Sequence, residues 1–187
     1  IVIFPISYII GDVLTEVYGF SKVRLVIWLG FAANLFAVLA FTVVGLLPAA
    51  GFWTGQEAYD VILGATPRIL AASFVAYLIG EFANSYILAR LKVATEGRML
   101  WLRTIGSSIV GQTLDSGVFV IVAFWGILPS NVLLTTIAVL AIAKIGYEIL
   151  ATPITYLVVN WLKRAEGIDH FDRETSFNPF AVSRLQD

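Results

Sequence analysis

Several uncharged apolar runs of about 20 residues dominate this sequence. Wound as a helix at about 1.5 Å per residue, each run is long enough to cross a hydrocarbon core of about 30 Å. The composition agrees, because 59% of the 187 residues are hydrophobic and only 13% are charged. One such run could be an anchor, whereas several make the helix bundle itself the protein. The sequence therefore predicts an all-α, polytopic membrane helix bundle.

The limits of these runs predict five membrane-spanning helices and a short polar tail. The spans are expected at residues 1–18, 23–47, 67–91, 100–128 and 132–162. Residues 49–66 suit a short interfacial helix. The last span would be roughly 46 Å long as a helix, so Pro153 is expected to kink or interrupt it. We expect residues 1–164 to form the transmembrane bundle and residues 165–187 a short cytoplasmic tail.

Positive charge is distributed unevenly between the two ends of the predicted bundle. Of the 12 lysines and arginines, all but two fall on the side of the tail; Arg68 falls on the other side and Lys144 within a span. Because Lys and Arg resist translocation, the tail side is predicted to be cytoplasmic. The expected location is the cell inner membrane, multi-pass, with a cytoplasmic C-terminus. Ile1 would then lie outside, and one preceding helix would give six spans in the full chain.

Ionisable side chains inside a bilayer cost about 2.5 to 3.5 kcal/mol each, so they require a partner or a purpose. Glu81 shares a helix face with Asn84, and Gln112 lies one turn before Asp115. Polar groups of this kind can simply hold helices together by hydrogen bonds. The six ionisable side chains within the predicted spans are Asp12, Glu16, Glu81, Asp115, Lys144 and Glu148.

The single cation among these six cannot neutralise every acid near the middle of the membrane. Lys144 and Glu148 are four residues apart and could form an intrahelical ion pair, for which a structural and a functional role are equally open. At least one of Glu81 and Asp115 is then expected to be unpaired, protonated or facing a polar ligand. We therefore expect these two acids to lie on a solute pathway. Asp12 and Glu16 lie nearer the cytoplasmic end and are predicted to serve as gate or coupling residues.

Several classes of function find no support in the sequence. The chain has no cysteine, and its one histidine, His170, lies in the tail. It contains no phosphate-binding glycine loop, hydrolase motif or basic stripe for nucleic acid. We expect no enzymatic activity, no catalytic residue, no cofactor, no metal and no nucleic-acid partner.

Four segments of the chain resemble the queuosine precursor transporter family, formerly grouped as vitamin uptake transporters. The most specific is FPISYIIGDVLTEVYGF, from Phe4 to Phe20. The others are GEFANSYILARLK, RTIGSSIVGQTLDSGVF and KIGYEILATPITYLVVNWLKRAEGIDHFD, which begin at Gly80, Arg103 and Lys144. The resemblance implies six helices, the first apparently missing here, and a fold similar to the substrate-binding subunits of energy-coupling-factor transporters.

The resemblance also implies a substrate. Members of this family import 7-cyano- or 7-aminomethyl-7-deazaguanine, and in some cases queuine, for queuosine salvage in tRNA. A carboxylate can accept both donors of a guanine-like edge, an amide or lysine can meet its carbonyl, and aromatic rings can cover its faces. The substrate-binding residues expected on this basis are Glu81, Asn84, Gln112, Asp115, Lys144, Tyr147, Glu148, Tyr8, Tyr86 and Phe4, with Phe119 as a further aromatic candidate.

A second function remains open at this point, that of a substrate-binding subunit of an ATPase-coupled vitamin or base importer. A face of small residues such as Ala32, Ala33 and Ala37 could dock a coupling module or pack against a neighbouring helix. The expected partners are a small deazapurine substrate and the lipid bilayer, with a homodimer left open. Uptake by this chain alone would exclude the second function.

Overall fold

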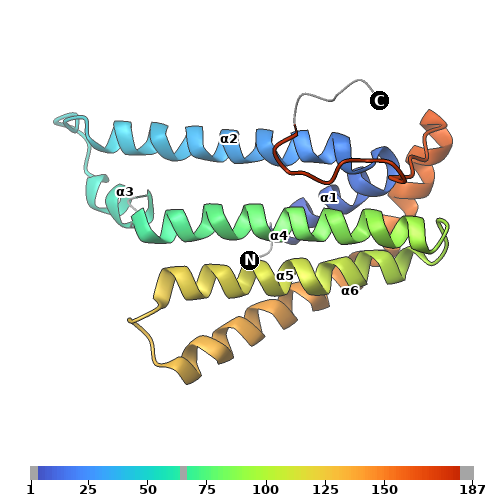
Figure 1. Cartoon of the computed structure of the whole chain (residues 1–187). Helices are drawn as coiled ribbons and strands as arrows, with labels where there is room; N and C mark the ends of the chain where they lie inside the picture. Colours follow the sequence, from blue (N-terminus) through green and yellow to red (C-terminus); the bar gives the residue numbers. More distant parts are fainter. Residues whose placement is uncertain (1–3, 64–66, 182–187) are drawn as a thin grey trace.

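The computed structural model describes residues 4–63 and 67–181, and these form six α-helices without any strand (Figure 1). The side chains of residues 4, 5 and 7 lie outside the description. The all-α prediction is confirmed. The helices are α1 (Phe4–Tyr18), α2 (Phe20–Gly45), α3 (Gln56–Leu63), α4 (Pro67–Ala94), α5 (Leu100–Phe124) and α6 (Ser130–Glu166).

Four of the described helices, α2, α4, α5 and α6, are long and apolar enough to cross a membrane. The 15 described residues of α1 would cover about 22 Å, which is less than a hydrocarbon core. This helix lies inside the bundle, with Asp12, Thr15 and Glu16 fully buried. The short helix expected between the second and third spans is α3, which has no buried residue.

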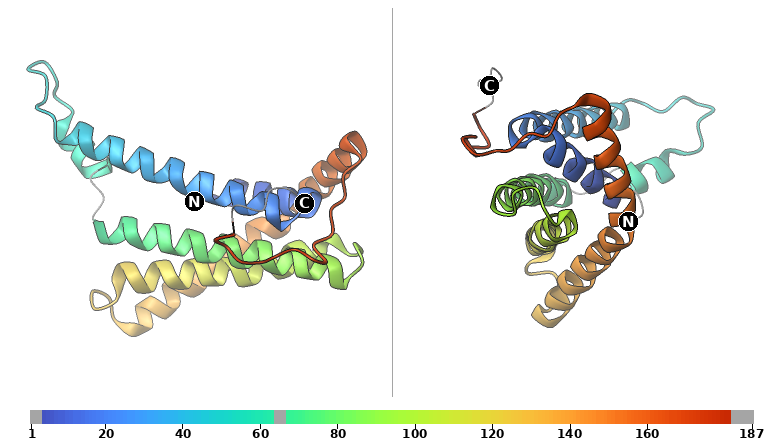
Figure 2. Two further views of the ribbon diagram at one scale, coloured as in Figure 1. Left: turned by 45° about the horizontal axis from the view of Figure 1, so that its top comes forward. Right: turned by 90° about the vertical axis from the view of Figure 1, so that its right-hand side faces the viewer.

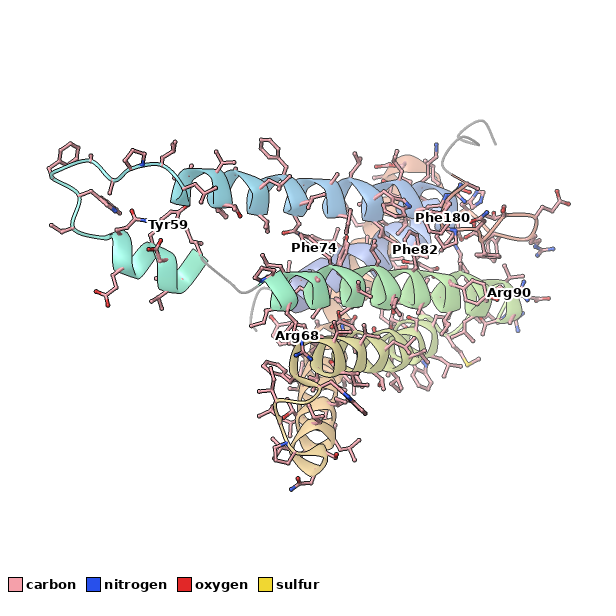
Figure 3. All side chains as sticks on the ribbon, turned by 60° about the vertical axis from the view of Figure 1, so that its left-hand side comes forward. Tyr59, Arg68, Phe74, Phe82, Arg90 and Phe180 are labelled. Atoms are coloured by element: carbon pink, nitrogen blue, oxygen red, sulfur yellow. The ribbon has the colours of Figure 1, made fainter. Side chains whose placement is uncertain are left out.

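Two ends of the bundle can be distinguished in Figure 1. At one end, here called the tail end, α4 connects to α5 and α6 leads into the tail, residues 167–181. The opposite end, here called the far end, carries α3 and the connection between α5 and α6. Figure 3 places Arg68 and Arg90 at opposite ends of α4, with Arg90 at the tail end.

Pro153 does not interrupt the last helix, contrary to one of the two outcomes expected. α6 is one helix of 37 residues, with Pro153 inside it. At about 56 Å this helix exceeds the thickness of a hydrocarbon core. Figure 1 shows α6 crossing behind α5 at an angle, and tilting of this kind accommodates excess length within a bilayer.

The tail packs back against the start of α2 instead of extending away from the bundle (Figure 2). Both carboxylate oxygens of Asp172 accept a hydrogen bond from the Phe20 amide, at 3.0 and 3.1 Å. Arg24 donates to two tail carbonyl oxygens and Trp28 to a third. Gly19, between α1 and α2, has a φ of 82° and contacts the His170 side chain so closely that a Cβ there would lie 2.3 Å from the ring. The tail is therefore part of the folded structure.

Aromatic side chains fill the space between α2 and α4 near the tail. Trp28 on α2 packs on Phe82 of α4 at a ring-centroid distance of 5.9 Å, and on Phe180 of the tail at 5.7 Å. Phe31 and Phe74 are 5.2 Å apart further along the same two helices. Figure 3 shows Phe74 and Phe82 on the face of α4 directed toward α2. These rings connect α2 to a bundle from which most of its other side chains are exposed.

Close approach of α4 and α5 depends on a glycine from each helix. A Cβ on Gly111 would lie 2.7 Å from the Cβ of Asn84 and 3.0 Å from the carbonyl oxygen of Gly80. A Cβ on Gly80 would lie 2.7 Å from the Cβ of Asp115. Neither neighbour is the flexible end of a long side chain, so the helices themselves would have to separate. Small residues allow this kind of approach in membrane bundles.

We expect Gly111→Ala to reduce the yield of folded protein markedly, because the added methyl group forces α4 and α5 apart. Overpacking in a tight interface costs about 1 to 3 kcal/mol. Gly117→Ala on the same helix is the matched control, because no atom lies within 4 Å of a Cβ built there. The measurement is the monodisperse fraction in detergent and its apparent melting temperature. Equal behaviour of the two variants would contradict the packing described here.

Candidate functional site

Buried polar side chains from four helices meet in the middle of the bundle and form what we call the central cluster. The i, i+3 spacing places Glu81 with Asn84, and Gln112 with Asp115, on the faces that α4 and α5 direct into the protein. The close contact of these helices at Gly80 and Gly111 brings the two polar faces together. The cluster consists of Tyr8 and Asp12 on α1, Glu81 and Asn84 on α4, Gln112 and Asp115 on α5, and Lys144 and Glu148 on α6.

Contacts between α1 and α4 define one side of this cluster. Asn84 donates a hydrogen bond of 2.6 Å from Nδ2 to Oδ1 of Asp12. A Cβ on Gly11 would lie 3.2 Å from Oε2 of Glu81, so that carboxyl group rests against the backbone of α1. The Tyr8 hydroxyl would lie 2.8 Å from a Cβ on Gly80. Asp12, predicted as a gate or coupling residue near the cytoplasmic end, therefore lies in direct contact with a predicted substrate-binding residue.

Lys144 on α6 pairs with Asp115 on α5, and not with Glu148 on its own helix. Its Nζ donates to Oδ2 of Asp115. The intrahelical pair expected from the sequence is therefore wrong. The physical reason is the direction of the side chains: Lys144 is 16% exposed and turns toward α5, while Glu148 is 1% exposed with both carboxyl oxygens buried inside the bundle. Asp115 is the paired acid, and Glu81 has no ion-pair partner in the part of the chain that the structure describes.

A cavity of about 310 Å³ borders the Lys144–Asp115 pair between α4, α5 and α6. Its volume is at the lower end of the range for small-molecule pockets. Phe119, one turn beyond Asp115, and Leu140, one turn before Lys144, also line the cavity. Because α5 and α6 run in opposite directions, both of these residues lie nearer the far end. The cavity therefore extends from the central cluster toward the far end.

Several buried atoms of the central cluster have no hydrogen-bond partner within the described residues. Buried polar groups are nearly always paired, so unpaired groups gathered at one place need an explanation. Most are acceptors, which a ligand rich in N–H donors could satisfy. They are the Tyr8 hydroxyl, Oδ2 of Asp12, Oδ1 of Asn84, Oε1 of Gln112 and both carboxyl oxygens of Glu148, with the hydroxyls of Ser108 and Ser116 nearby on α5.

Glu16 lies at the centre of a second group, the tail-end ion cluster, which contains Glu16, Lys92, Arg103, Lys163 and Asp169. Arg103 donates to both carboxylate oxygens of Glu16, at 2.7 and 3.1 Å. Lys163 donates to the same carboxylate at 2.7 Å, and Lys92 donates to the Glu16 backbone carbonyl. These contacts connect α1 with α4, α5 and α6, so the cluster closes the bundle at the tail end.

Asp169 of the tail completes this cluster. It accepts hydrogen bonds from Lys92 at 2.5 Å and is paired with Lys163 at 2.9 Å. Partial burial works to raise the pKa of Asp169, but the hydrogen bonds and charges of the two lysines outweigh it and hold that pKa below its ordinary value. Lys92 also donates to the His170 carbonyl oxygen at 2.6 Å. The same cations therefore hold both Glu16 and the tail.

Sequence reasoning missed the partners of Glu16. Arg103 stands near the start of the fourth predicted span with nothing to mark it as buried, yet it is 1% exposed and forms a bidentate pair with Glu16. The sequence does contain a signal for this cluster. Each of α4, α5 and α6 has a basic residue near its tail end, and α1 has an acid, Glu16, at the same end. One-dimensional spacing does not reveal which of several basic residues at a helix end turns inward.

Asp115, Lys144 and the further candidate Phe119 line the cavity, whereas Tyr86 and Tyr147 lie partly at the surface. Tyr86 is 42% exposed and packs on Phe177 of the tail, with ring centroids 5.0 Å apart. Tyr147 is 37% exposed on α6. The side chain of Phe4 lies outside the described residues. Phe119 is the aromatic candidate that lines the cavity.

Comparison with known proteins identifies the family of this chain. The family model described as "Putative vitamin uptake transporter" matches residues 1–158. The chain belongs to this family. The four long apolar helices of the described chain, together with membership of a transporter family, make it a multi-pass membrane protein.

Two curated relatives in the family are similar to most of the chain. The "Probable queuosine precursor transporter" of Bacillus subtilis (strain 168) is 32% identical over 146 residues, which cover 78% of this chain and 64% of the relative. The "Queuosine precursor transporter" of Escherichia coli (strain K12) is 30% identical over 122 residues, covering 65% of this chain and 52% of the relative. The chain thus spans less than two thirds of either relative. No solved structure matches it.

The Lys144–Asp115 pair can be tested by charge removal. Lys144→Met should lower the amount of folded protein, because breaking a buried pair leaves an uncompensated charge and costs about 3 to 5 kcal/mol. Adding Asp115→Asn should restore much of that loss, since neither charge then remains. The measurement is membrane-inserted protein per cell and its melting temperature after purification.

Lys144→Met combined with Glu148→Gln is the control for this pair. It removes the same number of charges but leaves Asp115 ionisable, and should restore less folded protein than the combination with Asp115→Asn. Better rescue through Glu148 would instead support the intrahelical pair.

Proposed function

We propose that this chain is a membrane transporter that imports queuosine precursors across the inner membrane for salvage into tRNA. The substrates would be 7-cyano- or 7-aminomethyl-7-deazaguanine, with queuine as a further candidate. Two relatives in its family have queuosine precursor transporter in their names. The observation that carries the proposal is the central cluster, which gathers unpaired buried acceptors and borders a cavity through its Lys144–Asp115 pair.

The chemistry of the central cluster suits a guanine-like edge. Such an edge offers a ring N–H and an exocyclic amine, which one carboxylate can accept together. Glu81 has no cation beside it within the described residues, and Asp115 borders the cavity. The unpaired oxygens of Asn84 and Gln112 would accept further N–H groups. Lys144 or the Tyr8 hydroxyl would donate to the base carbonyl, and Phe119 would cover a face of the ring.

The positions of the cavity and the tail-end ion cluster support transport by alternating access. The cavity reaches toward the far end, while the cluster around Glu16 closes the tail end. If the tail is cytoplasmic, as the distribution of positive charge predicts, this conformation would face outward. Opening inward would require Glu16 to separate from Arg103 and Lys163, which gives Glu16 the role of a gate residue. Substrate sites of transporters commonly lie near the midplane between two such ends.

We expect Glu81→Gln to weaken binding of 7-cyano-7-deazaguanine roughly ten- to a hundredfold, because the amide turns a donor toward a ligand donor. Loss of a charge-assisted hydrogen bond of this kind is worth about 1.5 to 3 kcal/mol. Asp115→Asn should weaken binding as well, though it also leaves Lys144 without its partner. Binding is measured by calorimetry on purified protein, and uptake in vesicles that contain this chain alone.

Glu57→Gln is the matched control, since Glu57 lies on the exposed helix α3. It should bind and transport like the unmodified chain. Unchanged affinity in both Glu81→Gln and Asp115→Asn would place the base elsewhere. Binding without uptake in vesicles that lack any ATPase would favour the alternative, a substrate-binding subunit of an ATPase-coupled importer.

The orientation in the membrane can be tested separately, because the chain has no cysteine of its own. A cysteine introduced at Thr54, exposed between α2 and α3, should react with an impermeant thiol reagent added to intact cells. A cysteine at Glu174, exposed in the tail, should react only after the membrane is opened. Labelling in the reverse order would place the tail outside and invert the direction assigned to the cavity.

A further inference from the structure

Among the described residues, three acids of the central cluster have no cation in an ion pair with them. Asp115 is paired with Lys144, and Glu16 with the cations of the tail-end ion cluster. The remaining acids, Asp12, Glu81 and Glu148, form no ion pair within the described part of the chain. Each ionised carboxylate in that position would carry an uncompensated charge inside a membrane.

Asp12 on α1 and Glu148 on α6 are the two of these acids with buried carboxyl oxygens that lack a hydrogen-bond partner among the described residues. The helices α1 and α6 pack against each other, so negative charge on one acid repels negative charge on the other. Glu148 is almost fully buried, and neither of its carboxyl oxygens has a hydrogen-bond partner among the described residues. Asp12 is held by Asn84 through Oδ1, while its Oδ2 is unpaired. The side chain of Asp12 is therefore fixed, and one of its oxygens remains available.

Two buried carboxyl groups of one polar cluster, with no cation beside either among the described residues, cannot both be ionised without a large electrostatic cost. A proton on either group removes one of the two charges and turns that carboxyl group into an O–H donor. The proton then belongs to the pair and not to one residue. Acids held in this way in membrane proteins commonly serve proton relays.

Among the described residues, the cations on the neighbouring helices already contact other groups. A proton is therefore left to neutralise the pair. Those from α1 and α4 are further acids and phenols, while Asp115 and Lys144 neutralise each other. On α2 the buried cation, Arg24, is directed to carbonyl oxygens of the tail. The ionisable groups that act on the pair or its neighbours are Tyr8, Glu16, Tyr77, Glu81 and Asp115. Lys144 lies beside Asp115.

We propose that Asp12 and Glu148 together bind one exchangeable proton and that this proton crosses the membrane with the substrate. The proposal rests on the proposed function, which it extends by naming the coupling ion. The proton would enter from the cavity side and form one carboxyl O–H bond. That bond would break on the tail side, leaving the carboxylate and releasing the proton to water. A proton needs only one oxygen, whereas a hard metal cation takes about six or more oxygen ligands.

Asp12 also provides a route from proton binding to substrate binding. Asn84 donates to Asp12 with one atom of its amide, and its unpaired Oδ1 is an acceptor that we assign to the base. Protonation of Asp12 would weaken that hydrogen bond and free the amide to turn. The charge on the pair and the position of a substrate-binding group would then change together.

The test is uptake of 7-cyano-7-deazaguanine, a neutral base, into vesicles with the membrane potential clamped. With one proton per base, an inward gradient of one pH unit should drive accumulation of about tenfold. A pH dye inside the vesicles should report acidification that depends on added base. Uptake that stops at equal concentrations, without proton movement, would overturn the proposal and leave the proposed function intact. Accumulation driven by sodium instead would also overturn it.

Glu148→Gln should abolish proton-coupled accumulation and the acidification that depends on added base, because the pair loses one of its two carboxyl groups. Asp12→Asn is the second variant if Glu148→Gln does not fold, and Glu57→Gln on the exposed helix α3 is the control. Proton-coupled accumulation by a folded Glu148→Gln or Asp12→Asn variant would overturn the assignment.

Infrared spectroscopy separates this proposal from the choice of substrate. The purified protein without substrate should show the carbonyl absorption of a protonated carboxyl group at pH 7, and Glu148→Gln should reduce or shift it. If the band is present and sensitive to Glu148 but no deazaguanine is taken up, the proposed function fails and the proton site stands. If the band is absent, or unchanged in both Glu148→Gln and Asp12→Asn, the proton site fails.

Discussion

The cost of burying charge determines how this bundle is arranged. Glu16 is fully buried, which is tolerable only because Arg103 and Lys163 approach it from two other helices and Lys92 from a third. Those contacts fix the tail-end portions of α1, α4, α5 and α6 relative to one another. The tail is bound by the same cations through Asp169. The packing of the whole tail end thus follows from neutralising a single carboxylate.

The two ends of the buried polar system have opposite balances of charge. The tail-end ion cluster contains three cations and two acids, so it has one positive charge in excess when all are ionised. The central cluster contains one cation and the four acids Asp12, Glu81, Asp115 and Glu148, and is therefore deficient in positive charge. A structural core would be expected to balance both groups. The imbalance at the centre supports the proposed site for N–H donors or a proton over a set of helix-packing contacts alone.

Much of this arrangement could be predicted from the sequence, because helical spacing fixes which side chains share a face. The four long helices, the polar faces of α4 and α5 and the buried position of Glu81 and Asp115 all follow from apolar runs and i, i+3 pairs. Partners across helices could not be predicted. Lys144 is equally well spaced for Glu148 and equally able to reach Asp115, and only the tilt of α6 against α5 decides between them. The packing of the tail could not be predicted either. It depends on backbone carbonyl oxygens that accept hydrogen bonds from Arg24 and Trp28, and every residue has such a carbonyl group whatever its side chain.

The shortest link between the central cluster and the tail-end ion cluster runs along α1. Asp12 and Glu16 are one helical turn apart, whereas the corresponding residues of α4, Asn84 and Lys92, are separated by two turns and those of α6, Glu148 and Lys163, by about four. The charges of Asp12 and Glu16 also interact directly. Loss of negative charge at Asp12 would relieve repulsion on Glu16 and strengthen its hold on Arg103, while its return would loosen the same contact. Protonation at the centre would therefore strengthen the closed tail end, and loss of the proton would weaken it.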